Sequence, residues 1–460
     1  MDTSTGAAQP SSDTDARIVA RLDRLPVTRM QVFWVIVLGL AYFVETFDNS
    51  VFAYAAPTIR AEWGLPLESI GVITSAVFVG MMIGAIVGGR ISDRFGRKRL
   101  LVWSSVFYSL GSLMSALAPN YEILAVSRVI TGIGVQAATG VIMVYLAEMF
   151  PRLSRGRFFS ALTFIGLTAG PVTSLLALRL ATEGAPGSWR WLFVLGAAGL
   201  LVAILAAVAL PESVRWLQSV GRHAAADRIV SKLETRAVAR TRRPLADPVV
   251  VPELATPKGT YRELLSPVYL KRIGVGTAGW FLFLFVVYGH LSWVATVLVE
   301  TGMSKTEALG FVSVLSFSSF VSPVLLFPVA DRLNRRTTIM IACLVAAVSF
   351  VVFSFALSPT VMVVFAFIGQ TMLAVGSAAF YTYIPEILPT HVRGIGAGFI
   401  NGVGRVGGVL QGLVIAGIFA AIGFQGLYLV LAAIVVLVGL IIGVLGERTA
   451  KRALEEISGE

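Results

Sequence analysis

The sequence contains little cysteine, histidine and charge, and each shortage excludes a class of protein. One cysteine cannot build a disulfide framework or a thiolate zinc site, and the three histidines are scattered. The chain has no GxxxxGK[ST] loop, so nothing indicates that it binds ATP. Charged residues make up 14% of the chain, against about 25% in soluble domains. We therefore expect no metal site, no cofactor and no enzyme activity.

Apolar residues are correspondingly abundant in this chain. They make up 56% of the chain, and the mean hydropathy is +0.81. Twelve apolar stretches are near the ~20 residues that a helix needs to cross a bilayer. They are residues 32–56, 70–90, 100–118, 122–149, 158–180, 190–210, 272–299, 306–330, 337–357, 360–385, 394–421 and 424–446. The sequence therefore predicts an all-α membrane protein with twelve transmembrane helices.

The net charge of +11 is distributed unevenly along the chain. With twelve crossings, both termini lie on one side of the membrane, and 31 of the 37 Lys and Arg residues fall on that side. Because positively charged loops stay in the cytoplasm, we expect cytoplasmic termini, a location in the inner (cell) membrane and contact with membrane lipids. The basic charge thus indicates membrane topology and no nucleic-acid binding.

Five segments follow from this pattern. We expect an N-terminal tail (1–30), a six-helix bundle (31–210), a cytoplasmic linker (211–271), a second six-helix bundle (272–446) and a C-terminal tail (447–460). The linker includes one amphipathic helix near 222–236.

The two bundles are repeats of one another at an offset of 238 residues. This offset pairs Gly64 with Gly302, Asp93 with Asp331, Arg94 with Arg332, Arg97 with Arg335, Tyr145 with Tyr383, Glu148 with Glu386, Pro151 with Pro389, Arg155 with Arg393 and Gly156 with Gly394. Six helices separate equivalent positions, so the two repeats have the same orientation in the membrane. Parallel repeats of this kind are typical of transporters whose halves move about a central site.

Two repeated motifs resemble those of the major facilitator superfamily. GRISDRFGRKR (89–99) is similar to the family's loop signature, and PVADRLNRR (328–336) is its second copy. YLAEMFPRLSRGR (145–157) and YIPEILPTHVRG (383–394) resemble the Glu-x-x-Pro-x-x-x-Arg-Gly element of sugar porters and related symporters. The resemblance implies a twelve-helix secondary transporter that needs no cofactor and is driven by an ion gradient.

These motifs predict a gate on the cytoplasmic side. We expect Gly89 to allow close helix approach, Gly96 or its counterpart Asn334 to form a left-handed turn, and each motif's Glu and Arg to pair across helix ends. The predicted gating residues are Gly89, Asp93, Arg94, Gly96, Arg97, Asp331, Arg332, Glu148, Arg155, Glu386 and Arg393.

The first predicted helix contains two acids on one face. YFVETFDNSVF resembles the Asp-Gly-Tyr/Phe-Asp element of aromatic acid:proton symporters, with Glu45 and Thr46 replacing the first two residues. Asp48 and Arg128, in the fourth helix, are at similar depths when counted at 1.5 Å per residue. Since charges in a membrane core are costly without partners, we expect Asp48 and Arg128 to pair and, with Glu45, to couple transport to protons. The alternative is an ion pair with a structural role alone.

Arg405 in the eleventh helix has no counterpart in the first repeat, because the 238 offset places Leu167 there. A fixed cation facing a cavity would suit a carboxylate, whereas the alternative is an arginine that only packs within the bundle. Residues near it in depth complete the predicted substrate site, which comprises Arg405, Asn401, Tyr288, Gln370 and Trp280.

We therefore expect a monomeric proton symporter for a small organic anion, such as an aromatic or other carboxylate metabolite. The alternatives are a proton-coupled exporter of drugs or metabolites, a sugar:proton symporter and a receptor that binds without transport. LPESVRWL (210–217) resembles the sugar-porter motif after the sixth helix, but the seventh helix lacks the glutamine-rich pattern of hexose carriers.

Overall fold

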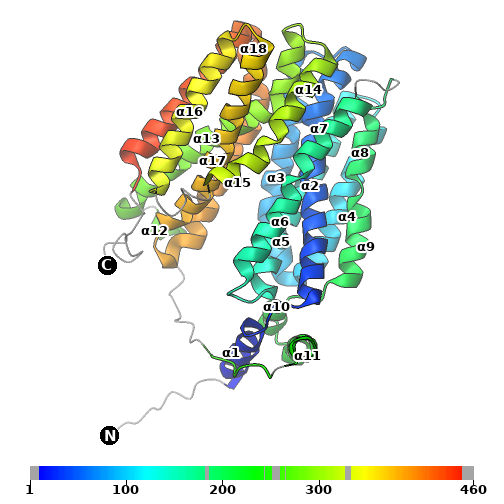
Figure 1. Ribbon diagram of the computed structural model, residues 1–460, viewed down its shortest axis with the longest axis vertical. Coiled ribbons are helices and arrows are strands. Elements are labelled where there is room, and N and C mark those ends of the chain that lie inside the picture. The colour runs from blue at the N-terminus through cyan, green and yellow to red at the C-terminus, as the bar shows by residue number, and fades with distance from the viewer. Residues whose placement is uncertain are drawn as a thin grey trace.

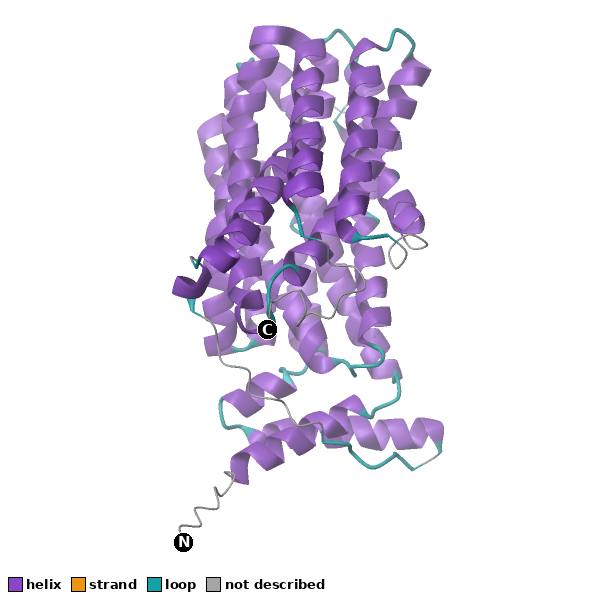
Figure 2. Ribbon diagram, turned by 90° about the vertical axis from the view of Figure 1, so that its left-hand side faces the viewer, coloured by secondary structure: helices purple, strands orange, loops and turns teal. Residues whose placement is uncertain are grey.

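The structure is a computed structural model, and it describes residues 10–181, 186–242, 244–250, 260–264, 266–326 and 333–447. Throughout these ranges the regular secondary structure is helical, and most of it forms two upright bundles (Figure 1). A smaller layer of helices lies beyond one end of the bundles (Figure 2). We call this end, where α2 and α13 begin, the linker face, and the opposite end the far face.

The first bundle contains the six predicted crossings of residues 31–210, and two of them are broken in the middle. The four continuous helices are α2 (Arg29–Trp63), α3 (Leu67–Phe95), α4 (Arg97–Leu117) and α5 (Tyr121–Met149). The fifth crossing consists of α6 (Arg155–Leu167) and α7 (Ala169–Leu180), and the sixth of α8 (Arg190–Gly196) and α9 (Gly199–Ala209).

Local sequence signals set the ends of these helices. Thr28 and Gln31 form a reciprocal capping box that begins α2, and Ser304 and Glu307 form another that begins α14 (Lys305–Ser316). Gly64 ends α2 with φ of 63°, a left-handed conformation that glycine adopts without strain.

The second bundle repeats this plan. Its helices are α13 (Pro267–Glu300), α14 followed by α15 (Ser318–Leu326), α16 (Arg335–Phe355), α17 (Pro359–Glu386), α18 (Thr390–Leu440) and a short π-helix (Ile441–Leu445). In the described chain, eleven helical stretches are long and apolar enough to span a membrane, and the last of them, His391–Leu445, has 55 residues.

That last stretch folds back on itself and supplies two crossings. Its backbone leaves the helical conformation at Gly423, where φ is 66° and ψ is −167°. A β-carbon added at Gly289 would lie 3.2 Å from Ile415 and 3.8 Å from Leu431. In a straight helix Ile415 and Leu431 would be roughly 24 Å apart. The predicted twelve crossings are therefore confirmed, with the turn between the last two at Gly423.

Glycines bring α3 and α5 into backbone contact. A β-carbon at Gly80 would collide with the carbonyl of Val129, and one at Gly132 would collide with the carbonyl of Val77. The prediction for Gly89 was wrong, because nothing lies within 4 Å of a β-carbon placed there. Close approach between these helices depends on glycines nearer the middle of the membrane, where small residues let backbones touch.

A layer of polar helices packs on the first bundle at the linker face (Figure 1). It consists of α1 (Pro10–Asp23), α10 (Val214–Ser219) and α11 (His223–Thr241), while the short α12 (Tyr261–Leu264) precedes α13. α11 confirms the predicted linker helix. Ile18 and Leu22 of α1 are buried in the same apolar cluster as Val230 and Leu233 of α11.

Ion pairs also hold α1 to α11. Arg21 pairs with Asp227 at 2.5 Å and with Glu234 at 2.6 Å, and Arg24 pairs with Glu234 at 2.6 Å. Partial burial raises the pKa of Glu234, but its hydrogen bonds with Arg21 and Arg24 outweigh this effect and hold that pKa below its usual value.

We expect Glu234→Gln to loosen α1 at pH 7. Each partly screened pair contributes at most about 1 kcal/mol, so hydrogen exchange of α1 should rise about three- to tenfold. Because the folded-state pKa is lowered, the stabilisation is present above the ordinary glutamate pKa of about 4.3 and is lost as the pH falls below it. Wild type and variant should therefore converge near pH 3 after correction for intrinsic exchange. Equal protection at pH 7 would contradict this prediction.

The two bundles meet in the middle and towards the far face. The contacting helix pairs are α3 with α18, α2 with α13, and α7 with α14. Ser75 donates a hydrogen bond to the carbonyl of Val409 at 2.6 Å, and a β-carbon at Gly71 would collide with the carbonyl of Gly412. Since α3 begins at the far face, these contacts close the interface on that side.

Candidate functional site

The predicted pair in the first bundle is present. Asp48 and Arg128 are both fully buried, and Nη1 of Arg128 lies 3.4 Å from Oδ2 of Asp48. Nη2 of Arg128 donates to the backbone carbonyl of Asp48, also at 3.4 Å, and the hydroxyl of Ser112 donates to Oδ1 of Asp48. Counting residues along α2 and α5 thus located this pair, because the depth of a residue in the membrane follows from its position along the helix.

Glu45 is one turn from Asp48 on α2 and is also buried. The hydroxyl of Thr139 on α5 donates to its Oε1, while its Oε2 has no partner among the described residues. The charge of Arg405 on α18 is near enough to act electrostatically on the Glu45 carboxylate. Glu45 therefore lies between the two bundles, whereas Asp48 lies within the first.

Arg405 is half-buried at the interface between the bundles. Its Nη1 lies 3.8 Å from the sulfur of Met81 on α3, and none of the described carboxylates lies within 4 Å of its guanidinium nitrogens. The guanidinium lies in the neighbourhood of Tyr381 on α17, a residue that is 56% exposed. A cation and an exposed aromatic side chain thus lie near each other at the interface between the bundles. Sequence reasoning missed Tyr381, because depth alone did not show which face of α17 lies towards the first bundle.

The other predicted substrate residues have separate places. Tyr288 lies close to both Tyr381 and Tyr42, at the interface. Trp280 is buried against Tyr381 at a ring-centroid distance of 5.2 Å, so it supports the Tyr381 ring and is itself inaccessible. The amide of Asn401 donates to the carbonyl of Ala397 in its own helix.

Gln370 lies apart from the predicted site. Its amide donates to the carbonyl of Leu315 at 3.1 Å, inside the second bundle. It is eleven residues before Tyr381 on α17, which corresponds to about 16 Å along the helix. The structure does not bring Gln370 together with Arg405.

The predicted gating residues of the first repeat form an ion-pair cluster at the linker face. Nη1 of Arg97 lies 3.1 Å from Asp93, and its Nε lies 3.0 Å from Glu148 on α5. Arg94 is exposed, with its guanidinium 5.3 Å from the ring centroid of Phe95. Gly96 has φ of 102° and ψ of 160°, so its φ is positive but its conformation is not the predicted left-handed turn.

The second repeat reproduces this cluster in part. Arg335 lies 3.5 Å from Glu386, at the same offset of 238 from Arg97 and Glu148. Asp331 and Arg332 lie outside the described residues. The prediction for Asn334 was wrong, because its φ is −66° and its side chain caps α16 by accepting a hydrogen bond from Arg336.

The prediction that the Glu and the Arg of each motif pair with one another was also wrong. Arg155 donates to the carbonyl of Phe150 at 3.4 Å, and Arg393 donates to the equivalent carbonyl of Leu388 at 3.3 Å. Each arginine therefore binds the chain just beyond the end of a helix. The carbonyls at the end of a helix lack partners within the helix, so these two arginines are taken up by backbone carbonyls. Glu148 and Glu386 pair instead with the arginine that begins the neighbouring helix.

Residues of the LPESVRWL segment join the gating cluster. The hydroxyl of Ser213 donates to Glu148 at 2.5 Å, and Glu212 accepts a hydrogen bond from the backbone of Lys98 at 2.9 Å. A β-carbon at Gly96 would collide with the Glu212 carboxylate. The motif resemblance flagged this segment, but only the fold shows that it reaches α4.

A second feature that the sequence did not predict lies near the far face. Arg60, in the last turn of α2, forms an ion pair with Glu300, the last residue of α13. Their side chains are 29% and 23% exposed. Opposite charges at the same ends of the first helix of each repeat were the available signal. This pair joins the two bundles on the side where they are closed.

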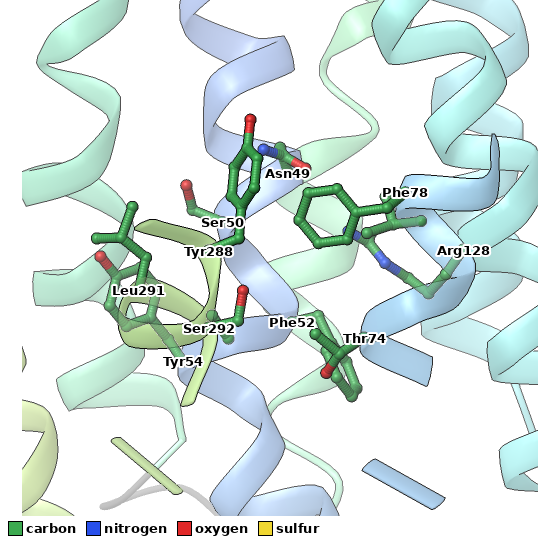
Figure 3. A pocket seen from close by; sticks show the side chains of 12 residues that line it. Asn49, Ser50, Phe52, Tyr54, Thr74, Phe78, Arg128, Tyr288, Leu291 and Ser292 are labelled. Atoms are coloured by element: carbon green, nitrogen blue, oxygen red, sulfur yellow. The ribbon is translucent and has the colours of Figure 1, made fainter. Parts of the chain in front are cut away.

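A pocket of about 110 Å³ lies between α2, α3, α5 and α13. Figure 3 shows Arg128, Phe78 and Thr74 at one side of it and Tyr54 and Leu291 at the other. The remaining lining residues are Asn49, Ser50, Phe52, Ala53, Val77, Tyr288 and Ser292. Polar groups from both bundles therefore meet in a space that includes the buried guanidinium.

Comparison with known proteins is consistent with this architecture. The family model of the Major Facilitator Superfamily matches residues 38–412. YyaJ of Bacillus subtilis is 32% identical over 411 residues, covering 89% of this chain and 90% of YyaJ. The niacin transporter NiaP of Acinetobacter baylyi is 28% identical, covering 96% and 99%, and the 4-hydroxybenzoate transporter PcaK of the same organism is 30% identical, covering 87% of each.

The fold is also shared with a solved transporter. The crystal structure of a D-xylose-proton symporter has a TM-score of 0.71 at 19% identity and covers 91% of this chain and 98% of its own. The chain is thus a multi-pass membrane transporter and not an enzyme, and it belongs to the major facilitator superfamily.

Proposed function

We propose that this transporter carries a small aromatic carboxylate together with protons. The observation that carries the proposal is Arg405, a cation at the bundle interface with no carboxylate partner within 4 Å among the described residues. A carboxylate substrate would supply that partner, and the exposed ring of Tyr381 would contact an aromatic group. NiaP and PcaK, named for niacin and 4-hydroxybenzoate, support this substrate class.

The acids on α2 support proton coupling. Glu45 lies near Arg405, and Asp48 holds Arg128, so protonation of either acid changes the charge that the substrate meets. A proton on Asp48 would remove the attraction that keeps Arg128 in place. A change of this kind can bias the equilibrium between two conformations, because it alters the free energy of one more than that of the other.

The charge clusters at the linker face support a gating role. Arg97 with Glu148 and Arg335 with Glu386 lie at equivalent positions of the two repeats, where relative movement of helix ends would make or break them. The distribution of basic residues supports a cytoplasmic location for this face, both termini and the linker.

We expect Arg405→Lys to weaken binding of 4-hydroxybenzoate or niacin by about 10- to 100-fold. Lysine keeps the charge but loses the planar pair of donors, and a hydrogen bond to a charged group contributes about 1.5–3 kcal/mol. Binding to purified protein can be measured by titration calorimetry, after a thermal-shift screen of aromatic acids, dicarboxylates and sugars.

The matched control is Arg29→Lys, the same substitution at an exposed position at the start of α2. It should leave affinity unchanged. Unaltered affinity in both Arg405→Lys and Arg405→Gln would show that Arg405 has only a structural role, and would contradict this part of the proposal. In vesicles, accumulation driven by an inward proton gradient indicates uptake, and accumulation driven by an outward gradient indicates export.

A further inference from the structure

We propose that the pocket beside Arg128 is a second binding site for the carboxylate of the transported anion. It would be an outer station, separate from the inner one at Arg405. The inference rests on the proposed function, since it takes the substrate to be an anion. It adds that the anion meets two cations in turn on its way across the membrane.

Arg128 is short of hydrogen-bond acceptors. A guanidinium has five N–H donors, but in the described structure Arg128 makes only two hydrogen bonds, both to Asp48 and both 3.4 Å long. Its Nε has no hydrogen-bond partner among the described residues, although the side chain is fully buried. Good N–H···O bonds are about 2.7–3.2 Å long, and an under-satisfied buried charge is costly. An anion in the pocket would supply the missing acceptor.

The pocket wall offers further donors where such a ligand would lie. Neither Asn49 nor Ser292 forms a hydrogen bond with the part of the chain that the structure describes, so both are free to donate. Thr74, in contrast, donates to the carbonyl of Ile70 in its own helix. Phe52 and Tyr54 supply apolar surface. A charged donor, two polar donors and aromatic walls suit a small aromatic monocarboxylate.

An aromatic pair separates this pocket from Arg405. The rings of Phe78 on α3 and Tyr288 on α13 lie 4.5 Å apart between centroids and line the pocket. Arg405 contacts Met81, which is one turn beyond Phe78 towards the linker face. The two cations therefore lie on opposite sides of this ring pair, and the anion would pass between them when the rings part.

The far-face ion pair lies between this pocket and the far face, by position along α2 and α13. Arg60 is six residues beyond Tyr54 on α2, and Glu300 is eight residues beyond Ser292 on α13. At 1.5 Å per residue these distances are roughly 9–12 Å. Opening of this ion pair would expose the pocket, so the outer station would be the first cation that an entering anion meets.

The test counts bound benzoate on the purified full-length protein by equilibrium dialysis, at a concentration that saturates both stations. Wild type should bind two equivalents. Ser292→Leu, which fills the pocket, should bind one, Arg405→Gln should bind one, and the double variant none. Ser160→Leu, the same substitution at an exposed position of α6, should keep two.

Asn49→Leu provides a second way to fill the pocket if Ser292→Leu does not yield folded protein. One equivalent in the wild type that Arg405→Gln removes and both pocket variants keep would overturn the outer station and leave the proposed function standing. Two equivalents of which only the pocket variants remove one would support the outer station and count against Arg405. No benzoate bound to the wild type would overturn both.

Discussion

Asp48→Asn is expected to abolish proton-driven accumulation, so that the internal-to-external substrate ratio falls to about one. Asparagine has nearly the shape of a protonated aspartic acid and can still meet Arg128 and Ser112, but it cannot release a proton. Exchange of internal for external substrate requires no deprotonation and should survive at least in part. Both activities can be measured in vesicles that contain the purified variant.

Asp247→Asn, in the exposed linker, is the control and should accumulate substrate normally. Continued accumulation by Asp48→Asn would place the proton site elsewhere, and Glu45 would be the next candidate. Loss of exchange as well would assign Asp48 to the substrate site or to the fold. A loss of the fold would have a physical basis, since changing one member of a buried pair can cost about 3–5 kcal/mol.

Arg60→Glu is expected to open the far face and to lower transport about tenfold or more. It sets two carboxylates at the point where Arg60 and Glu300 now join the bundles, and like charges in contact repel. The double variant Arg60→Glu with Glu300→Arg restores opposite charges and should recover most of the transport. Recovery in the swap is the result that a role in local folding alone would not produce.

Labelling can test the conformational change directly. In a Cys343→Ala background, a cysteine introduced at Ala53, which lines the pocket, should react faster with a membrane-impermeant maleimide from the far side in Arg60→Glu than in the parent. Glu122→Arg, a charge reversal at an exposed position in the first turn of α5, should leave the rate unchanged. Equal labelling in Arg60→Glu and its parent would show that the ion pair does not hold the far face closed.

Several features could be predicted without the fold because they depend on position along the chain. Hydropathy located the crossings, since a bilayer imposes a length on every helix. The 238-residue offset identified the repeat, and the structure keeps it down to individual contacts, as Arg335 with Glu386 reproduces Arg97 with Glu148. Asp48 and Arg128 could be paired because depth in a membrane follows directly from residue number.

Features that depend on the rotation of helices about their axes were missed or misplaced. Gly89 carries the motif, yet Gly80 and Gly132 make the close contact between α3 and α5. Gln370 has a suitable depth but binds Leu315, whereas Tyr381 on the same helix lies nearer Arg405. Residue number gives depth well and the facing direction poorly, because small differences in helix rotation and crossing angle decide which side chains meet.

The sequence by itself determined the membrane class, the twelve crossings, the repeat and the buried acid–arginine pair. All of these follow from the cost of exposing polar groups to lipid and from helical rise, which act along one chain segment at a time. The tertiary structure alone decided that Arg405 lies near Tyr381, that Arg60 meets Glu300, and that Phe78 contacts Tyr288 at the interface. Each of these contacts joins helices far apart in the chain, so it exists only once the two bundles pack against each other.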